Sequence, residues 1–296
     1  MGIGPQIFIA YNELFSKVDV STIKRVCEIG RQNLCINERI DEKIDKLFDL
    51  FNKQVNKKIY DLAPKDNWGL RAKILYESLG MEYSSIDIDN EEVGEDKSSN
   101  FELDLNYDEI DKNFINKFDF VTNFGTSEHI LNQLNFFKTM HDITRVGGYM
   151  ISELPCMFGL NHGMFKYEPK FFMDLARANA YSIVDFYMVE DPPSLNIYRW
   201  DQYKQINGCK DLCIIAIMQK LHDTKFCIPL CGNYELKIKN DIMERYDYVI
   251  QGEIIKGDQT THILRYQNEL SHLKKEVLFK ELFKRFLIKF GLKKPN

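Results

Sequence analysis

The sequence predicts a doubly wound α/β fold built on a mostly parallel sheet of seven strands. Short apolar stretches recur along the chain, several of them end in polar residues, and helical stretches separate the early ones. Strands that alternate with helices are typical of parallel sheets. The last two strands follow each other without a convincing helix, which predicts an antiparallel pair at one edge. The expected strands are 25–30, 83–88, one near 101–104, 118–123, 149–154, 182–189 and 211–219.

An inserted amphipathic helix is expected early in the chain, over 37–58. Gly30 and Asp87 are 57 positions apart, whereas the usual spacing between a glycine loop and the acid of the second strand is ~20 residues. Within this excess, apolar residues recur at helical spacing and charged residues fill the other face. Two interpretations remain open, a lid over the site and a helix that packs on the sheet edge. The apolar residues are Ile40, Ile44, Leu47, Phe48, Phe51 and Val55.

The other helices are predicted from capping residues and spacing. An apolar segment at 7–10 begins a helix that leads into the first strand. The crossover helix is expected over 66–79, with Asp66 or Asn67 as its N-cap and Gly80 as its terminator. Further helices are expected over 127–141, 168–179 and 268–290.

The C-terminal helix, 268–290, is basic on one face and apolar on the other. Residues 271–296 carry eight Lys or Arg and two Glu, a balance of +6. Such a helix can lie on an anionic membrane surface, on a partner chain or on its own domain. The expected organisation is an N-terminal lead (1–24), a ligand-binding domain (25–235) and a C-terminal extension (236–296).

Composition excludes several classes of protein. A chain of 296 residues can bury a full core. Its net charge of −5 argues against a nucleic-acid partner. No cleavable signal peptide is visible, and no apolar run approaches the ~18 residues of a spanning helix. We therefore expect a cytoplasmic protein, with peripheral association at the inner membrane face as an open alternative.

Four cysteines form two C-x-x-x-C pairs, Cys209 with Cys213 and Cys227 with Cys231. A zinc site is one interpretation of this pattern. However, 211–218 has the pattern of a core strand, and four extended residues span roughly 13 Å. That distance is too long for two thiolates of one zinc site, so we expect no metal here.

The end of the first strand carries an acid and a single glycine, Glu28 and Gly30, and the second strand ends in Asp87. Two acids in these places suit a cofactor with an ammonium group and a ribose. A dinucleotide needs small residues at its loop, so that the backbone can approach the pyrophosphate. Gly30 is followed instead by Arg31, Gln32 and Asn33. This pattern disfavours NAD and is compatible with S-adenosylmethionine, which has no phosphate.

Four segments together resemble the successive motifs of class I S-adenosylmethionine-dependent methyltransferases. They are Val26-Cys-Glu-Ile-Gly30, Ser85-Ile-Asp87, Phe118-Asp-Phe-Val-Thr-Asn-Phe-Gly-Thr-Ser-Glu-His129 and Gly147-Gly-Tyr-Met-Ile-Ser-Glu-Leu-Pro155. The resemblance covers about 25–220 and implies a Rossmann-like methyltransferase fold with S-adenosylmethionine as cofactor. The segment from His162 to Phe172 also resembles small-molecule methyltransferases of bacterial glycan and secondary-metabolite pathways.

The resemblance implies a set of cofactor-binding residues. Glu28 and Gly30 would contact the methionine end, and Asp87 would accept hydrogen bonds from the ribose hydroxyls, with Asp89 as the alternative. Asp104 would lie near the adenine, or would be a plain turn residue. Three further residues would line the floor under the sulfonium. The full set is Glu28, Gly30, Asp87, Asp104, Asn123, Phe124 and Gly125.

Methyl transfer to a hydroxyl also requires a base. His129 and His162 are the candidates, since histidine titrates near neutral pH, and Tyr167 and Glu153 are substitutes. The acceptor would be a small molecule, such as a sugar or a nucleotide sugar. A competing hypothesis is a catalytically silent subunit that binds a partner through the inserted helix and the basic tail. A nicotinamide-dependent oxidoreductase is disfavoured by Arg31 and Gln32.

Overall fold

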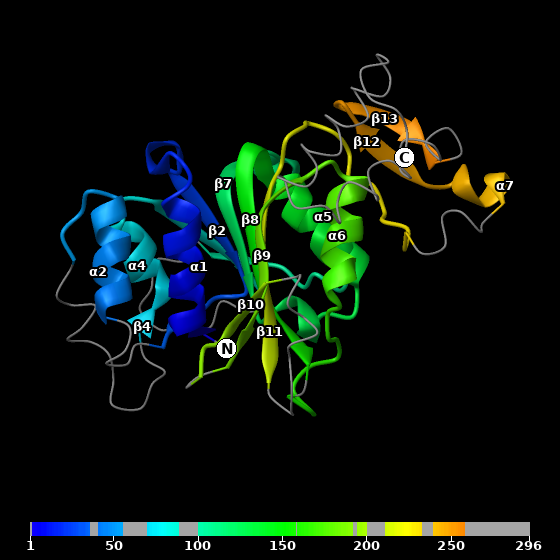
Figure 1. Cartoon of the computed structure of the whole chain (residues 1–296). Helices are drawn as coiled ribbons and strands as arrows, with labels where there is room; N and C mark the ends of the chain where they lie inside the picture. Colours follow the sequence, from blue (N-terminus) through cyan, green and yellow to red (C-terminus); the bar gives the residue numbers. More distant parts are fainter. Residues whose placement is uncertain are drawn as a thin grey trace, which may run out of the picture.

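The computed structural model describes residues 2–35, 41–55, 70–88, 100–157, 159–191, 194–199, 211–232 and 239–257. In these residues an eight-stranded sheet separates two layers of helices (Figure 1). Across the sheet, the strands lie in the order β10 (Ile197–Arg199), β9 (Ser182–Glu190), β11 (Leu212–Gln219), β8 (Thr144–Met157), β7 (Phe118–Phe124), β2 (Arg25–Ile29), β5 (Glu82–Asp87) and β6 (Asn100–Glu102).

The sheet reverses its direction of growth beside β2. From β2 the chain moves outward to β5 and β6, and then crosses back to β7 on the other side of β2. All of these neighbours are parallel. In a doubly wound sheet, ligands bind outside the carboxyl ends of the strands at such a switch point. The topology therefore predicts a site above the ends of β2, β5 and β7.

The predicted fold class is confirmed: the sheet is doubly wound and mostly parallel. The expected antiparallel pair is also present, because β11 runs antiparallel to β9. Two details differ from the expectation. β11 lies inside the sheet, between β8 and β9, and the short strand β10 adds an eighth member at the edge. A three-residue strand within a long loop carries too few residues for its periodicity to be recognised.

Helices cover both faces of the sheet (Figure 1). One layer holds α1 (Pro5–Phe15), α2 (Asp41–Leu50) and α4 (Ala72–Ser78), and the other holds α5 (Gln133–Ile143) and α6 (Pro169–Ala178). Every residue of β7 is buried, as is nearly all of β11. A strand that is covered on both faces is a continuous apolar run rather than an alternating one.

The N-terminal helix belongs to the core of the sheet domain. The Tyr11 ring packs against Phe120 and Phe124 of β7, and its hydroxyl lies 2.6 Å from the hydroxyl of Tyr76 on α4. The inserted helix α2 in turn packs on α1: Asn12 donates to the carbonyl of Lys43 at 3.0 Å. Within the described residues, α2 is shorter than the predicted 37–58; positions 37–40 and 56–58 lie outside them.

Two predicted helices begin later than expected. Leu70–Arg71 forms a short strand, β4, so α4 begins only at Ala72, and the predicted caps Asp66 and Asn67 lie outside the described residues. Gly80 ends α4 with φ +88°, as predicted. The helix expected at 127–141 is divided: Ser127–His129 forms a 3₁₀ turn, η4, and α5 begins at Gln133. Asn132 caps α5 by accepting a hydrogen bond from the backbone N–H of Asn135.

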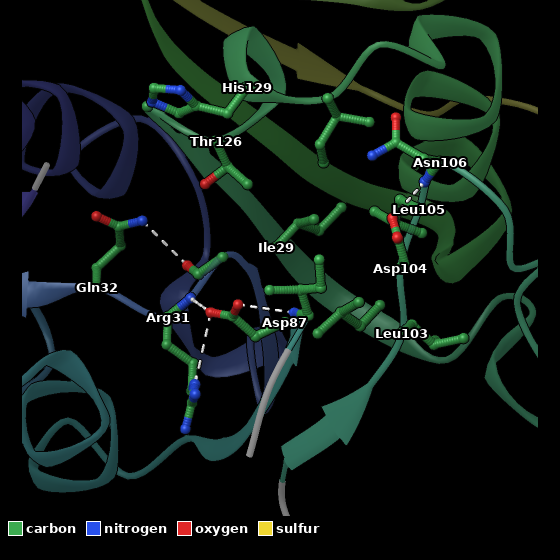
Figure 2. Close-up of a pocket in the computed structure, with 15 residues that line it drawn as sticks. Ile29, Arg31, Gln32, Asp87, Leu103, Asp104, Leu105, Asn106, Thr126 and His129 are labelled. Atoms are coloured by element: carbon green, nitrogen blue, oxygen red, sulfur yellow. Dashed lines mark hydrogen bonds and ion pairs between the residues drawn. The ribbon is translucent and has the colours of Figure 1, made fainter. Parts of the chain in front are cut away.

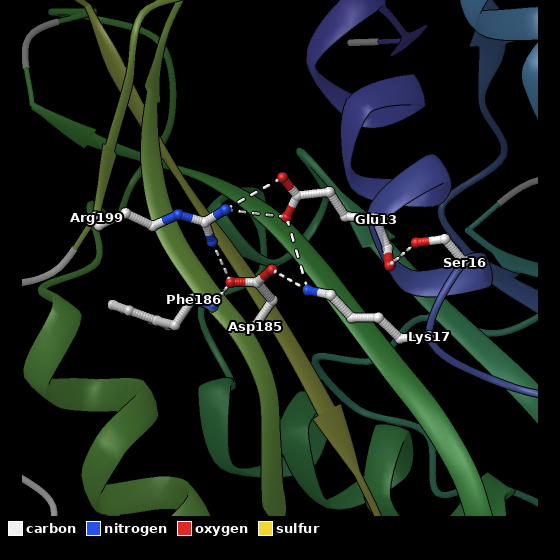
Figure 3. A network of polar contacts seen from close by, with 6 residues as sticks. All are labelled: Glu13, Ser16, Lys17, Asp185, Phe186 and Arg199. Carbon is white, nitrogen blue, oxygen red and sulfur yellow. Dashed lines mark hydrogen bonds and ion pairs between the residues drawn. The ribbon is translucent and has the colours of Figure 1, made fainter. Parts of the chain in front are cut away.

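A network of charged side chains joins α1 to the far edge of the sheet (Figure 3). Asp185 on β9 accepts from Lys17 at 2.7 Å and from Arg199 on β10 at 2.5 Å. Arg199 also contacts Glu13 on α1 at 3.2 Å. The pKa of Asp185 is lowered because hydrogen bonds and positive charges around its carboxylate outweigh its burial. The network therefore fixes the small edge strand to the first helix.

Smaller elements complete the described residues. β1 (Gly2–Ile3), β3 (Asn33–Leu34) and β4 form a three-stranded sheet, and β12 (Asp247–Ile250) pairs with β13 (Glu253–Lys256) after the short helix α7 (Asn240–Met243). Among the helices that the structure describes, none is long and apolar enough to cross a membrane. The predicted basic helix, 268–290, lies outside the described residues.

Candidate active site

A cavity of about 340 Å³ opens at the switch point that the topology marks (Figure 2). The loop after β2 forms one wall, the end of β5 and the segment 103–106 form another, and the turn after β7 closes the far side. Six apolar residues line it beside the polar groups: Ile29, Ile86, Ile88, Leu103, Leu105 and Ile130. Such a surface can hold a flat heterocycle while a few polar groups fix its orientation.

Gly30 shapes the first wall. Its φ of +81° lies in the left-handed region that glycine favours. A Cβ at this position would lie 2.1 Å from Oγ1 of Thr126, a residue of the turn after β7. The Gly30 N–H donates to the carbonyl of Ile86 at 2.8 Å, which ties the loop to β5. Glycine is therefore needed both for the turn and for the close approach of Thr126.

Glu28 is placed beneath the loop and does not line the cavity. Its buried carboxylate accepts hydrogen bonds from the hydroxyls of Tyr83, at 2.8 Å, and Tyr76, at 3.2 Å, and from the backbone N–H of Gln32, at 3.2 Å. Burial raises the pKa of Glu28 to about 7, although these hydrogen bonds oppose the shift. In this arrangement Glu28 orders the backbone that surrounds the cavity.

Asp87 ends β5 and lies in the cavity (Figure 2). Oδ2 accepts from the backbone N–H of Arg31 at 2.8 Å and lies 3.5 Å from its Nε, while Oδ1 accepts from the N–H of Ile88 at 2.8 Å. Arg31 itself lines the cavity, and sequence reasoning treated it only as a bulky replacement for a glycine. Asp89, the alternative ribose ligand, lies outside the described residues.

Asp104 is both a cavity residue and a turn residue. Its Oδ1 accepts from the N–H of Asn106 at 2.9 Å, and its own N–H donates to Asp108 at 2.8 Å. The two interpretations of Asp104 are therefore compatible, because the turn holds the carboxyl group at the cavity wall.

Of the three residues expected under the sulfonium, only Gly125 lines the cavity. Asn123 is buried, and its side chain bonds the backbone N–H and the hydroxyl of Ser127 at 3.2 and 3.1 Å. Phe124 packs in the core against Tyr11. Asn123 therefore shapes the turn that follows β7, and Phe124 anchors the strand.

The two predicted catalytic histidines come together around Glu128. Nε2 of His162 lies 3.5 Å, and Nε2 of His129 3.8 Å, from Oε1 of Glu128. The two imidazole centroids are 5.2 Å apart, and His129 also lines the cavity. Burial and the proximity of His162 lower the pKa of His129. Burial, reinforced by the carboxylate of Glu153, raises the pKa of Glu128 to about 7.

The substitute bases are less suitably placed. The Tyr167 hydroxyl lies 2.8 Å from both Ser127 Oγ and Gln133 Oε1 and hydrogen-bonds both side chains, and its pKa is raised by burial. Glu153 is fully buried, with its pKa raised, and lies beside Asp191 and Cys213. Of the cysteines in the two C-x-x-x-C pairs, Cys213 and Cys227 are buried and free. Cys213 is the single cysteine in the described group with Glu153 and Asp191.

No family model matches the chain, and no curated protein sequence matches it significantly. Solved structures with a similar chain path include the StiE O-MT (13% identity, TM-score 0.38, covering 72% of this chain and 74% of that one). A possible histamine N-methyltransferase from Thermotoga maritima has 14% identity and a TM-score of 0.35, covering 72% of this chain and 89% of that one. The 1,6-didemethyltoxoflavin-N1-methyltransferase of Burkholderia thailandensis, with bound 1,6-didemethyltoxoflavin and S-adenosylhomocysteine, has 9% identity and a TM-score of 0.38, covering 72% of this chain and 78% of that one. These likenesses are too distant to carry an argument about function.

Proposed function

We propose that this protein is an S-adenosylmethionine-dependent methyltransferase that acts on a small molecule. The observation that carries the proposal is one cavity that combines a single-glycine loop, the carboxylate of Asp87 and a histidine, His129, at the switch point of a doubly wound sheet. Carboxylates at the end of the second strand suit ribose hydroxyls. Arg31 and Gln32 line the cavity where a dinucleotide site would need small residues.

The proposal assigns each part of this cofactor to a region of the cavity. Asp87 would accept hydrogen bonds from the ribose hydroxyls. These bonds would replace its present hydrogen bond from the Arg31 N–H or form beside it. The apolar side chains near Asp104 would hold the adenine, and Gly30 and Gly125 would let the backbone approach the methionine end. When bound, S-adenosylmethionine supplies a methyl group that is already activated by the sulfonium.

The chain's own contribution would be positioning and proton removal. Holding an acceptor oxygen in line with the methyl group converts a bimolecular step into an intramolecular one. His129 lines the cavity and His162 lies beside it, with ring centroids 5.2 Å apart, and one of them would take the proton of a hydroxyl acceptor. We propose a hydroxyl of a sugar or nucleotide sugar as the acceptor, in keeping with the resemblance of the segment that follows His162.

Calorimetric titration with S-adenosylmethionine and S-adenosylhomocysteine tests this proposal. We expect saturable binding that Asp87→Ala weakens about tenfold or more, because hydrogen bonds to a charged group contribute ~1.5–3 kcal/mol. Glu102→Ala is the matched control: Glu102 pairs with Asp87 across β5 and β6 but is exposed and lies outside the cavity. Absence of binding at millimolar cofactor, or equal weakening by both variants, would reject the cofactor assignment.

A second candidate function follows from the contacts that Asp87 already makes with Arg31. Its carboxylate already bonds the backbone and side chain of Arg31, and such a pair also suits a cavity that has lost its ligand. In that case the protein would be a catalytically silent subunit that binds a partner through its helical additions. The same titration separates the two functions, since the silent subunit binds no cofactor.

A further inference from the structure

Two segments that are far apart in the sequence meet at Glu128. Its carbonyl accepts hydrogen bonds from the N–H groups of Met164, at 2.8 Å, and Phe165, at 3.2 Å. A Cβ on Gly163 would lie 2.7 Å from Cγ of Glu128, so glycine lets the loop after β8 approach the turn after β7. This contact places the imidazole of the preceding residue, His162, beside the Glu128 carboxylate.

The carboxylate of Glu128 has an unusual environment. It is fully buried, and neither of its oxygens has a hydrogen-bond partner within the part of the chain that the structure describes. Burying a carboxyl group without a partner is unfavourable, and such groups are rare in folded proteins. An unpaired carboxylate in contact distance of two histidines therefore suggests a ligand that the protein alone does not supply.

The three side chains have the spacing of metal ligands. One ligand atom from each of Glu128, His129 and His162 lies within 4.8 Å of the others. Two atoms bound ~2.1 Å from a single tetrahedral ion are about 3.4 Å apart. The observed separations from Oε1 of Glu128 to the two Nε2 atoms, 3.5 and 3.8 Å, differ from this value by only a few tenths of an ångström. The third separation, between the two imidazoles, is within 4.8 Å.

We propose that Glu128, His129 and His162 form a binding site for a divalent transition-metal ion. Two imidazoles and one carboxylate suit zinc and its neighbours in the first transition row, whereas magnesium prefers oxygen ligands. The imidazoles are 48% and 40% exposed, so an ion can enter from solvent. Three protein ligands leave at least one coordination position for another molecule.

The position of the site suggests what this open coordination position does. His129 lines the cofactor cavity, which places the ion at its rim. If the proposed function holds, and only then, the ion would bind the acceptor oxygen and lower the pKa of its hydroxyl. The two histidines would then act as ligands rather than as the base, and the hydroxyl proton would pass to solvent water at this exposed site. The methyl group would leave the sulfonium for the acceptor oxygen, and S-adenosylhomocysteine would be released. Metal binding itself does not depend on the cofactor.

The test uses the full-length protein without a histidine tag, stripped with a chelator and titrated calorimetrically with Zn²⁺ and separately with Mg²⁺. We expect one equivalent of Zn²⁺ to bind, with Mg²⁺ at least tenfold weaker. Co²⁺ should give visible absorption bands that report nitrogen and oxygen ligands. Glu128→Gln and His162→Ala should each weaken Zn²⁺ binding at least about tenfold. Both variants are expected to fold, because Gln has nearly the same shape as Glu and the His162 side chain is partly exposed. Circular dichroism verifies that they do.

Two control variants make the assignment specific. His222→Ala removes a histidine outside the cluster and should leave the Zn²⁺ affinity unchanged. Glu153→Gln alters the neighbouring group of Glu153, Asp191 and Cys213, the other described set of side chains with metal-ligand spacing. The proposal is overturned if the wild type binds no Zn²⁺, if folded Glu128→Gln binds it normally, or if only Glu153→Gln abolishes binding. A titration with S-adenosylhomocysteine on the same samples judges the cofactor assignment independently.

Discussion

Two glycines with nearly the same backbone conformation face different surroundings. Gly30 has φ +81° and Gly147 has φ +79°. A Cβ on Gly147 would meet only the end of the Arg145 side chain, at 3.1 Å, which can move away. A Cβ on Gly30 would meet Thr126 atoms at 2.1 to 2.9 Å, including its Cβ. Comparing substitutions at the two glycines therefore distinguishes the backbone strain of a positive φ from the steric clash of an added Cβ.

We expect Gly147→Ala to lower the free energy of unfolding by about 1–2 kcal/mol, the strain of a non-glycine residue in the left-handed region. Gly30→Ala should be more destabilising by at least ~1 kcal/mol, since overpacking is added to strain. Urea denaturation measures both variants, and titration with S-adenosylhomocysteine should find weaker binding only for Gly30→Ala. Equal destabilisation would mean that Thr126 moves aside without penalty.

The burial of Glu28 makes stability depend on pH. Its pKa is raised from 4.5 to about 7 in the folded protein. The folded state therefore holds this proton more tightly than the unfolded state, so stability falls as the pH rises from about 4.5 to about 7. Glu28→Gln cannot ionise. Relative to wild type, it should gain stability between pH 5 and pH 8, by up to about 3 kcal/mol.

Urea denaturation at both pH values measures this change, because it compares each variant with wild type under the same conditions. Glu82→Gln, at the exposed start of β5, is the control: it gives the change in stability from replacing an exposed Glu by Gln. If the difference between wild type and Glu28→Gln is the same at pH 5 and pH 8, then Glu28 does not titrate in this range.

At the scale of residues, a strand end determines where a side chain lies. Asp87 and Gly30 both line the cavity, since both lie at the ends of parallel strands, and their roles in cofactor binding stay predictions. The partners of these residues could not be predicted: Thr126 is 96 positions from Gly30 in the sequence, and its approach depends on the tertiary fold. The contact of Glu128 with His162 could not be predicted either, since it depends on the conformation of the loop after β8.

At the scale of elements, the charged network around Asp185 should stabilise the edge of the sheet. The Asp185 side chain is only 10% exposed, and it joins Lys17, just after α1, to Arg199 on β10. We expect Asp185→Asn to lower the free energy of unfolding by ~1–2 kcal/mol, because a charge-assisted network at a partly buried site is lost. Thermal or urea denaturation measures the effect.

The matched control is the exposed pair between Lys138 and Asp142 on α5. Lys138→Ala removes a bond of the same length, 2.7 Å, but one that joins residues of a single helix. Its loss should change stability by no more than ~0.5 kcal/mol. If the two variants are equally mild, the network does not hold β10 to α1.

Strands were predictable where they are long and apolar, although β8 extends over Thr144–Met157, well beyond the predicted 149–154. β2, β5, β7, β9 and β11 were each placed within about two residues. The inserted helix was expected as a lid or as a packed helix, and the described part, α2, packs on α1 and contributes no residue to the cavity. That outcome depends on Asn12 and the apolar face of α1, which sequence spacing alone does not connect to α2.

For the whole molecule, the position of the cavity predicts how a ligand should affect unfolding. Its walls come from segments after β2, β5, β6 and β7, so ligand binding requires the centre of the sheet to be folded. S-adenosylhomocysteine at 100 times its dissociation constant should add ~2.7 kcal/mol to the free energy of unfolding. In a protein of this size we expect the melting temperature to rise by about 5 °C or more.

Scanning calorimetry measures this rise, and Asp87→Ala at the same ligand concentration should show less than half of it. A rise of equal size in that variant would place the ligand elsewhere.

The basic helix predicted at 268–290 lies outside the described residues, so its contact with a membrane or a partner stays a prediction.

The fold class was predictable because both faces of the sheet are covered, which makes each strand an apolar run between helices. The strand order was not predictable in full. The insertion of β11 between β8 and β9 reverses one strand inside the sheet, and nothing in its apolar run, Leu212 to Gln219, specifies neighbours.

The place of β11 also has a consequence for the order of events during synthesis. β8 and β9 are not neighbours, because residues 212–219 lie between them. Until the ribosome has released that segment, β8 has one unpaired edge and β9 has no place in the sheet. Unpaired apolar strand edges readily pair with other chains. The nascent chain therefore exposes this edge of β8 from the release of β8 until β11, the last strand of this sheet along the chain, has emerged.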